Sequence, residues 1–502
     1  MPTHYTHNRV AMLVVLLLLA ATWWLRAPLH ALPLERDEGA YATIAARLLA
    51  GDRLYQDLFD HKPPLVHLVY TLAAAAPGDP VVAVRILATL YLMATAMLLL
   101  ALAWCLYGRR AALASLALLL AYASSWRFQG LTFNSEAVML LPATLGCLLA
   151  VVALLRQRPW LLLGAGVAVG LAVLAKPIGL ALVVPLLLAP ILARWRWQSS
   201  LLALSLGAGG VAMPLALFAL LIWAQGSIGA ANEALLIYNR LYAAESVAQG
   251  WDLTQLWRIW QPMLTLAIPA LLGWLWLSLA LVAQRNASPP GLRAAHSLAT
   301  LWGWALLATA FLSLRPYPHY YLAALPLLSL WAGSGLAWLA QSVAQKLERS
   351  WFALLATSFA VLVMIAPVPN ELASLRHMPP DEQISHLYAW DGAQYFAPAR
   401  AVAAYVAANV PPDQPIFVWA AEPQIYYMAQ RRPASRFVYD YPVDRLPGAR
   451  DELLADLRRA PPPLIITYAQ VRPIGFHPFF EEEGYVLTTT LGGFDLFERV
   501  LR

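Results

Sequence analysis

The sequence predicts an all-α polytopic membrane domain with about eleven transmembrane helices, followed by a small C-terminal α/β domain. Three observations lead to this fold class. Of the 502 residues, 60% are hydrophobic and 12% are charged, whereas a soluble domain carries about 25% charged residues. The hydrophobic residues are gathered in runs long enough to cross a bilayer. The last part of the chain instead alternates short apolar runs with polar, helix-like segments.

The apolar runs are the predicted membrane-spanning helices. A spanning helix needs roughly 20 apolar residues, within a range of about 17 to 25. The predicted spans are 10–26, 81–106, 111–126, 133–155, 159–175, 178–194, 201–224, 262–283, 297–314, 319–341 and 351–368. We expect the first span to remain uncleaved, because it ends in two tryptophans, a leucine and Arg26 and has no small-residue cleavage site.

The basic residues predict the orientation of the chain. With the N-terminus in the cytoplasm, the inner loops carry most of the basic residues, as the positive-inside rule requires. These residues are Arg9, Arg109, Arg110, Arg156, Arg158, Arg194, Arg196, Arg285, Arg293, Lys346 and Arg349. The alternate short loops carry only Arg127, Lys176, Arg240, Arg258 and Arg315. An odd number of spans then places the C-terminal segment on the outer face. The low lysine content and the high alanine, leucine and arginine content suggest a bacterial source, so we expect a multi-pass inner-membrane protein with a periplasmic C-terminal domain.

The net charge of +6 does not predict a nucleic-acid partner. The arginines flank apolar runs and form no continuous patch, so they indicate topology and contact with membrane lipids. Cys105 and Cys147 both lie in predicted spans without a CxxC partner. This placement excludes a disulfide framework and a thiolate metal site.

Two segments are too polar to lie in the membrane, and we expect both on the outer face. One is the loop at about 27–80, which belongs to a transmembrane domain 1–369; the other is the tail 370–502, which forms the α/β domain. Within the loop, Leu65–Ala76 is apolar but too short to span, so it predicts an interfacial or re-entrant helix. In the tail, 415–419 and 463–468 predict buried strands, and 451–459 predicts a surface helix.

The remaining polar residues collect at the predicted outer interface. They lie at Glu35–Glu38, Tyr41, Asp57–Pro64, Asn134–Glu136, Lys176–Pro177, Tyr238–Arg240 and Arg315–Tyr320. The spans themselves carry almost no charge, which argues against a proton relay or an ion pathway through the bilayer. Any chemistry is therefore expected at the outer interface.

Lysine is scarce, and two of the three lysines lie at this interface. The chain has 3 Lys and 31 Arg, and Lys62 and Lys176 each precede a proline. A lysine retained among arginines suggests a need for a compact ammonium charge, as in phosphate binding. Carboxylates at the same interface can take the proton of a reacting hydroxyl. The combination favours group transfer from a phosphate-linked donor.

The order of these motifs resembles glycosyltransferase family 39. The pattern is Asp37-Glu-Gly-Ala-Tyr41, then Asp60-His-Lys-Pro-Pro64, then Glu136, Lys176-Pro177 and His319-Tyr320. The tail segments 418–426 and 431–435 resemble the outer domain of bacterial members. The resemblance covers nearly the whole chain and implies a GT-C membrane fold, like that of protein O-mannosyltransferases and lipid A aminoarabinose transferases.

The resemblance also implies an activity and a set of site residues. It implies inverting transfer of a sugar from a polyprenyl-phosphate carrier to a lipid, glycan or protein acceptor on the periplasmic side. The implied catalytic residues are Asp37, with Glu38 beside it, and Glu136. The implied donor-phosphate residues are Lys62 and Lys176, with Arg240 and Arg315 as further cations, and the implied substrate-binding residues are Tyr41, His61, His319 and Tyr320.

A divalent metal is left open by the same resemblance. Some relatives bind a metal through a carboxylate directly before the lysine of the Lys-Pro-Pro motif. This chain has His61 at that position. We therefore predict no metal site and no cofactor, although a divalent ion stays an alternative.

Simpler explanations exist for these residues. Asp37 and Glu38 are favourable at the start of any helix, and a cap at 134 or 135 would explain Glu136 as a helix-end charge. The two lysines could be interfacial anchors, and His319 and Tyr320 could belong to an aromatic belt. A lipid or glycan transporter or flippase is the alternative function. Such proteins usually show repeated halves and polar residues at the middle of the membrane, and the sequence shows neither.

Overall fold

The chain folds as two units in a computed structural model that describes residues 2–249, 253–283, 289–312, 317–388, 393–469 and 476–500. The first unit comprises Met1–Pro28, Ala88–Phe218 and Gln249–Leu375. The second comprises Leu29–Leu87, Ala219–Ala248 and Arg376–Arg502. The first outer loop therefore groups with the C-terminal tail, whereas the sequence-based division at residue 370 assigned it to the membrane domain.

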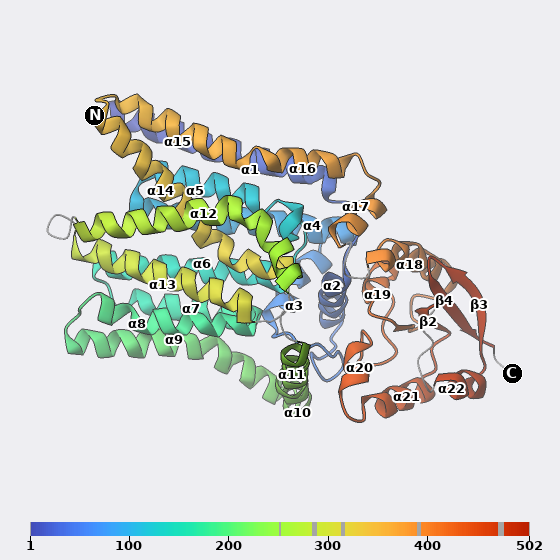
Figure 1. The fold of residues 1–502 in the computed structure, drawn as a ribbon. Coiled ribbons are helices and arrows are strands. Elements are labelled where there is room, and N and C mark those ends of the chain that lie inside the picture. Colours follow the sequence, from blue (N-terminus) through green and yellow to red (C-terminus); the bar gives the residue numbers. More distant parts are fainter. Residues whose placement is uncertain are drawn as a thin grey trace. The chain divides into compact units, whose positions relative to one another are not determined.

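The first unit is a bundle of long helices (Figure 1). They are α1 (Pro2–Arg26), α4 (Pro80–Tyr107), α5 (Arg109–Tyr122), α6 (Ser135–Arg156), α7 (Leu161–Ala175), α8 (Val183–Leu192), α9 (Trp197–Ala224), α12 (Leu253–Ala283), α13 (Pro290–Leu312), α14 (Leu325–Lys346), α15 (Ser350–Ile365) and α16 (Pro367–Arg376). Short 3-10 helices join them: η2 (Trp126–Phe128), η3 (Pro177–Leu182) and η5 (Pro318–Ala324). The start of α4 and the last residues of α9 and α16 belong to the second unit.

Each of the eleven predicted spans falls on a helix of this bundle. Among the described residues, seven helical stretches are long and apolar enough to cross a membrane: Arg9–Leu29, Pro80–Tyr107, Ser135–Arg156, Trp197–Ala224, Trp260–Ala283, Pro318–Lys346 and Ser350–Arg376. The other four predicted spans fall on α5, α7, η3 with α8, and α13. Of these, α5 has 14 residues and α7 has 15. The mostly helical membrane domain is confirmed.

Small residues let the helices of the bundle approach closely. A Cβ atom added to Gly335 of α14 would lie 2.3 Å from the Cα atom of Gly273 in α12. Glycine at both positions lets the two backbones touch, as is common between membrane helices. A larger residue at either position would push α12 and α14 apart.

The second unit combines short helices with one sheet. Its helices are α2 (Arg36–Leu49), α3 (Leu65–Ala74), α10 (Ile228–Asn232), the π-helix η4 (Glu233–Tyr238), α11 (Asn239–Gln249), α17 (Pro380–Leu387), α18 (Pro398–Asn409), α19 (Gln424–Ala429), α20 (Tyr441–Arg445), α21 (Ala449–Arg459) and α22 (Phe476–Glu483). The short helix predicted after residue 64 is thus confirmed as α3, and the surface helix at 451–459 as α21.

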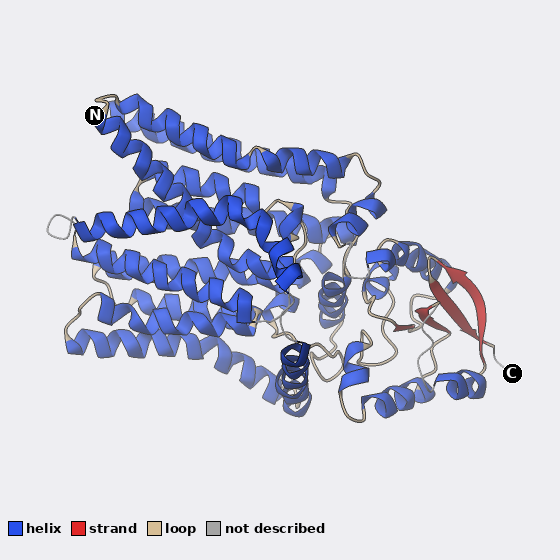
Figure 2. Ribbon diagram, in the orientation of Figure 1, coloured by secondary structure: helices blue, strands red, loops and turns tan. Residues whose placement is uncertain are grey.

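The strands lie in the C-terminal part of the chain (Figure 2). They are β1 (Phe417–Trp419), β2 (Leu464–Tyr468), β3 (Tyr485–Leu491) and β4 (Phe494–Arg499), in the order β1-β2-β4-β3. β1 and β2 are parallel, and the other two pairs are antiparallel. Apolar residues of α18 and α19, such as Val402 and Ile425, pack with Ile466 and Leu496 of the sheet. This arrangement confirms the predicted α/β domain and its first two strands.

Candidate active site

Glu35 and Glu38 form a capping box at the start of α2. The Glu35 carboxylate accepts hydrogen bonds from the backbone N–H groups of Asp37 at 2.9 Å and Glu38 at 3.0 Å. In return, the Glu38 carboxylate accepts from the Glu35 N–H at 3.2 Å. Burial, followed by the charges of Asp37 and Glu38, raises the pKa of Glu35 well above its ordinary value. Glu35 and Glu38, on either side of Asp37, therefore cap the helix, and the Asp37 side chain takes no part in the cap.

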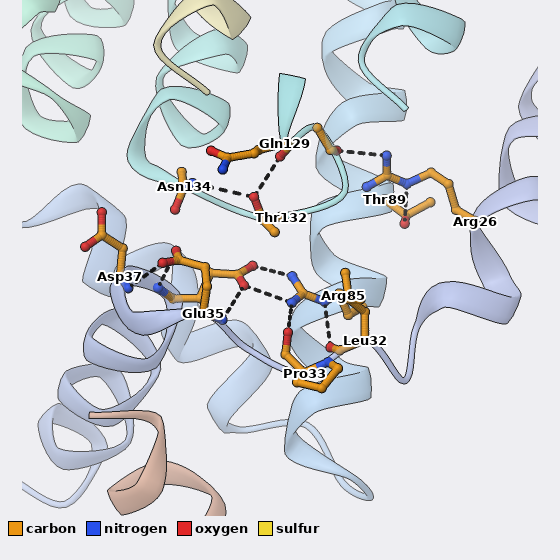
Figure 3. Close-up of polar contacts among 12 residues, drawn as sticks. Arg26, Leu32, Pro33, Glu35, Asp37, Arg85, Thr89, Gln129, Thr132 and Asn134 are labelled. Atoms are coloured by element: carbon orange, nitrogen blue, oxygen red, sulfur yellow. Dashed lines mark hydrogen bonds and ion pairs between the residues drawn. The ribbon is translucent and has the colours of Figure 1, made fainter. Parts of the chain in front are cut away.

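Arg85 of α4 neutralises the buried Glu38. Its guanidinium forms a two-pronged ion pair with the Glu38 carboxylate, with one N–O distance of 2.8 Å. The same group donates to the carbonyl oxygens of Leu32 at 3.1 Å and Pro33 at 2.6 Å (Figure 3). A buried carboxylate is costly unless it is paired in this way. Because these contacts occupy Glu38, the geometry gives no support to the catalytic role predicted for it.

Asp37 lies in a different environment from its neighbours. Its side chain is half-buried, and its carboxylate is turned away from Glu35 (Figure 3). Among the residues that the structure describes, the Asp37 carboxylate makes no hydrogen bond or ion pair. Its negative charge acts on the pKa values of His61 and Tyr439, so these groups lie near it. Asp37 is therefore the acidic residue of this segment that is available for chemistry.

A group of polar and aromatic residues of the second unit surrounds this position. We call it the loop cluster; it consists of Asp37, Tyr41, Asp60, His61, Lys62, His67 and Tyr439. The sequence analysis selected four of these residues, and the structure adds the other three. Six come from the first outer loop and one from the C-terminal tail.

Asp60 organises the loop cluster. Its Oδ1 atom accepts a hydrogen bond from the Tyr439 hydroxyl at 3.0 Å and from the Lys62 backbone N–H at 3.3 Å. The Nδ1 atom of His61 lies 3.2 Å from the same oxygen and 3.1 Å from the Tyr439 hydroxyl. Burial alone would raise the pKa of Asp60, but the His61 hydrogen bond and the charges of His67, His61 and Lys62 outweigh burial and hold that pKa well below its ordinary value. Asp60 thus stays ionised and fixes the loop that carries Lys62.

His67 of α3 faces the other carboxylate oxygen of Asp60. Its Nε2 atom lies 3.3 Å from Asp60 Oδ2, without the alignment of a hydrogen bond. Burial lowers the pKa of His67 to about 4, against the attraction of the Asp60 charge. The Tyr41 ring packs edge-on against the His67 ring at 5.6 Å. Tyr41 is only 1% exposed, so in this structure it packs the cluster from inside.

Lys62 is held by its backbone and keeps its side chain half-buried. Its carbonyl oxygen accepts a hydrogen bond from the Tyr55 hydroxyl at 3.0 Å. Its N–H group is fixed by Asp60, as above, and two prolines then lead into α3. The charge of Lys62 lowers the pKa values of both His61 and Asp60. The loop therefore presents one ammonium group at a defined place beside the buried carboxylate.

Residues just before and at the start of α11 contact His61 of the loop cluster. Asn239 donates a hydrogen bond to the His61 carbonyl at 2.9 Å. The Tyr238 and Tyr242 rings lie 5.1 and 5.7 Å from the His61 ring. Arg240 itself is exposed, so its phosphate-binding role stays a prediction. The other predicted cation, Arg315, lies outside the described residues.

The first unit brings the remaining predicted residues together. We call Gln129, Glu136, Lys176, His319 and Tyr320 the span cluster. The Lys176 ammonium forms an ion pair with Glu136 Oε1 and lies 3.9 Å from the centre of the Tyr320 ring, a cation–π contact. His319 Nε2 lies 3.9 Å from the same Glu136 oxygen, and His319 Nδ1 lies 2.6 Å from Gln129 Oε1. Three distant stretches of sequence thus supply one ion pair and its aromatic cover.

Glu136 is more than a helix-end charge. Asn134 is the N-cap residue of α6, yet its side chain makes no capping hydrogen bond. The Glu136 carboxylate is 1% exposed and also accepts a hydrogen bond from the Ser135 hydroxyl at 3.1 Å. Lys176 balances its charge. In this structure the two groups that the resemblance assigned to catalysis and to phosphate binding neutralise each other.

The described residues hold no group of three or more His, Cys, Asp and Glu side chains arranged for a metal ion. Asp60, His61 and His67 are neighbours, but Lys62 and the Tyr439 hydroxyl share their surroundings. We therefore derive no step through a metal.

Four residues that the structure adds differ in how easily the sequence could have revealed them. Asp60 stands inside the Asp60-His-Lys-Pro-Pro64 motif, and Arg85 is a charge within an apolar run, so both could have been selected. His67 lies in a predicted short helix, where a buried histidine resembles a packing residue. Tyr439 follows Asp60 by 379 positions, and no local pattern connects them.

Comparison with known proteins gives a family match over part of the chain. Residues 61–223 match the family described as dolichyl-phosphate-mannose-protein mannosyltransferase. This stretch includes His61, Lys62, Glu136 and Lys176, whereas Asp37 precedes it and His319 follows it. No curated protein matches the sequence.

Solved structures share the fold over most of the chain. ArnT from Cupriavidus metallidurans, bound to undecaprenyl phosphate, matches with a TM-score of 0.61 and 16% identity, covering 97% of this chain and 98% of ArnT. The oligosaccharyltransferase of Archaeoglobus fulgidus in the apo form matches with a TM-score of 0.55 and 12% identity, covering 92% and 70%. AglB from the same organism, in complex with an inhibitory peptide and a dolichol-phosphate, matches with a TM-score of 0.51 and 13% identity, covering 91% and 69%. These matches agree with the resemblance found in the sequence: residues 61–223 are similar to the mannosyltransferase family, and the fold of the chain is similar to that of ArnT and of the oligosaccharyltransferase.

Proposed function

We propose that the chain is a glycosyltransferase that moves a sugar from a polyprenyl-phosphate carrier to an acceptor hydroxyl, with inversion at the anomeric carbon. The observation that carries the proposal is the state of Asp37. Its carboxylate has no hydrogen-bond or ion-pair partner among the described residues, while Glu35 and Glu38 on either side are held by the cap and by Arg85. A carboxylate kept out of the structural network of α2 suits a general base.

The proposed reaction is a direct displacement. The acceptor oxygen forms a bond to the anomeric carbon while the bond from that carbon to the phosphate oxygen breaks, and the phosphate leaves with the electron pair. A neutral hydroxyl is a poor nucleophile, so Asp37 accepts its proton as the new bond forms, an effect of typically 10²- to 10⁴-fold. Attack from the side opposite the phosphate inverts the anomeric centre.

The leaving phosphate needs positive charge because it departs as an anion. Lys62 suits this role, since Asp60, Tyr55 and the prolines fix its backbone while its side chain stays half-buried. A compact ammonium group is a common phosphate ligand. Lys176 would have to share its charge with Glu136, so we assign it a supporting role, and the catalytic role of Glu136 stays a prediction.

The relatives support the class of carrier and leave the acceptor open. ArnT was solved with undecaprenyl phosphate and AglB with a dolichol-phosphate, both of which are polyprenyl-type monophosphates. A lipid, a glycan or a protein hydroxyl fits the proposed chemistry equally well. The distribution of basic residues supports an N-terminus in the cytoplasm and a reaction on the outer face. With the resemblance to bacterial members of the family, we propose that this face is the periplasmic side of an inner membrane.

Binding of undecaprenyl phosphate tests the carrier assignment without knowledge of the sugar or the acceptor. We expect the purified chain to bind this lipid, and Lys62→Ala to bind it roughly 10- to 100-fold more weakly, because a contact to a charged group is worth about 1.5–3 kcal/mol. The matched control is Lys346→Ala, which removes an exposed lysine at the predicted inner face. Equal affinity of Lys62→Ala and wild type would remove Lys62 from the phosphate site, and absence of wild-type binding would contradict the carrier class.

A further inference from the structure

Two grooves of the first unit share a pair of arginines at the start of α5. The first, which we call the α15 groove, is a cavity of about 830 Å³ between α1, α5 and α15. The second, the α12 groove, is a cavity of about 510 Å³. It is lined by the C-terminal end of α4, the start of α5, and residues of α12, α13 and α14. Arg109 and Arg110 line both. All of these helices belong to the bundle drawn in Figure 1.

The walls of the α15 groove are suited to acyl chains. Apart from the two arginines and three hydroxyl residues, its lining is apolar. Leu354, Leu355 and Leu362 are 55%, 58% and 60% exposed. They lie on a helical stretch that is long and apolar enough to cross a membrane. Such exposed apolar walls call for lipid chains as neighbours.

The α12 groove has a mixed lining. Leu277 and Leu281 of α12 supply apolar surface, and Tyr107, Ser334 and Gln341 line the groove together with the two arginines. Arg110 donates a hydrogen bond to the Gln341 side chain. A guanidinium has five N–H donors in a planar fork, so one such bond leaves donors for a further ligand.

The position of the arginines explains how one pair serves both grooves. Arg109 and Arg110 are the first two residues of α5. Consecutive residues of an α-helix point roughly 100° apart around its axis. The two side chains therefore diverge and present charge to both grooves. The sequence places them among the basic residues predicted to face the cytoplasm, where a bilayer carries anionic lipid.

We propose that the two grooves and the arginine pair form one binding site for a phospholipid with two phosphates and four acyl chains, the class that cardiolipin represents. Each arginine binds one phosphate, and the acyl chains are shared between the two grooves. Basic pockets between membrane helices are known binding places for such headgroups. A lipid with one phosphate would leave an arginine or a groove unused. The proposal uses no residue of the loop or span cluster and so stands independently of the proposed reaction.

Native mass spectrometry of the delipidated full-length chain tests this site with cardiolipin, phosphatidylglycerol and phosphatidylethanolamine as probes. We expect the wild type to bind one cardiolipin at least tenfold more tightly than either other lipid. Arg109→Gln/Arg110→Gln should bind cardiolipin roughly 30-fold more weakly, which corresponds to about 1 kcal/mol for each arginine. The matched control is Arg194→Gln/Arg196→Gln, an exposed arginine pair that lines neither groove and should bind as the wild type does. Equal binding of all three lipids, or equal loss in both double variants, would overturn the proposal.

A second variant tests the acyl-chain part while it leaves both arginines in place. Ser358 lines the α15 groove and is exposed, so Ser358→Trp should fill the groove without disturbing the helix core. We expect roughly tenfold weaker cardiolipin binding, because excluding about two methylene groups is enough for that loss. Leu217→Trp, at an exposed position of α9 that lines neither groove, is the control. Unchanged binding by Ser358→Trp would show that no chain occupies the groove.

Discussion

At the scale of single residues, Asp37 and Asp60 differ in burial and in the number of partners that their carboxylates have. Asp60 is buried and tied to Tyr439, His61 and the Lys62 backbone, whereas Asp37 is half-buried and has no such partner among the described residues. The sequence motifs contained both aspartates but could not distinguish them. The difference comes from Tyr439, which no local pattern links to the loop. A buried ionised group with partners positions the site, and a less constrained one is left for chemistry.

The burial of His67 predicts a pH dependence of stability. Burial lowers the pKa of His67 from 6.5 to about 4. Between these values the unfolded chain binds a proton that the folded chain excludes, so stability rises with pH across this window, by about 3 kcal/mol for the full shift. His67→Gln should show a smaller rise than the wild type, as measured by denaturation at pH 4.5 and pH 7, while His61, whose pKa burial also lowers, still contributes.

Two further points make the His67 measurement specific. The lowered pKa of Asp60 gives a contribution that is lost only below about pH 3.9, its ordinary value in unfolded chains, and so lies outside the window. His377→Gln, which replaces an exposed histidine, is the control and should keep the wild-type slope. The same slope in wild type and His67→Gln would contradict the assignment.

At the scale of elements, α2 is placed by its contact with the segment around α19. The Thr43 hydroxyl donates to the Pro423 carbonyl at 2.9 Å, and Arg36 forms an ion pair with Glu422 at 3.2 Å. Between them, Gly39 lies directly against the backbone of Gln424. The sequence predicts an outer loop and an outer C-terminal domain, but a glycine at position 39 gives no signal of which backbone lies against it.

Gly39→Ala should destabilise the protein. The added Cβ atom would lie 2.5 Å from the backbone nitrogen of Gln424 and 2.7 Å from its Cα, so α2 or α19 must shift. We expect a loss of about 1–3 kcal/mol, as for other overpacked sites, visible as a lower melting temperature in detergent. Gly209→Ala, in a helix with nothing within 4 Å of the added atom, is the control and should be neutral or stabilising. Equal melting temperatures for Gly39→Ala and wild type would show that this contact is loose.

At the scale of the whole molecule, the sequence predicted local features such as helices and strands, but it did not predict which distant segments pack together. The eleven predicted spans all fall on helices because apolar length is a local property of the chain. The first two strands and the helix at 451–459 were predictable for the same reason. The grouping of 29–87 and 219–248 with the tail was not, since it depends on contacts across hundreds of residues. In the span cluster, the order of the motifs led to four residues that do lie close together, namely Glu136, Lys176, His319 and Tyr320. It did not predict that Lys176 and Glu136 form an ion pair.

This organisation predicts that the tail is required for the structure of the first outer loop. A chain that ends at residue 375 loses Glu422, Pro423 and Tyr439, and with them the contacts that hold α2 and Asp60. Hydrogen exchange should then show faster exchange in α2 and α3, while α14, which packs within the first unit, keeps its protection. Unchanged protection of α2 in the shortened chain would mean that the loop folds without the tail.

The most direct test of the central claim is the rate of sugar transfer from an undecaprenyl-phosphate sugar by Asp37→Asn. The account predicts a rate roughly 10²- to 10⁴-fold below that of the wild type, with the fold intact and donor binding retained. Asp57→Asn, which removes a surface acid of the same loop that pairs with Arg53, should transfer at the wild-type rate. A folded Asp37→Asn protein that transfers sugar as fast as the wild type would contradict the account.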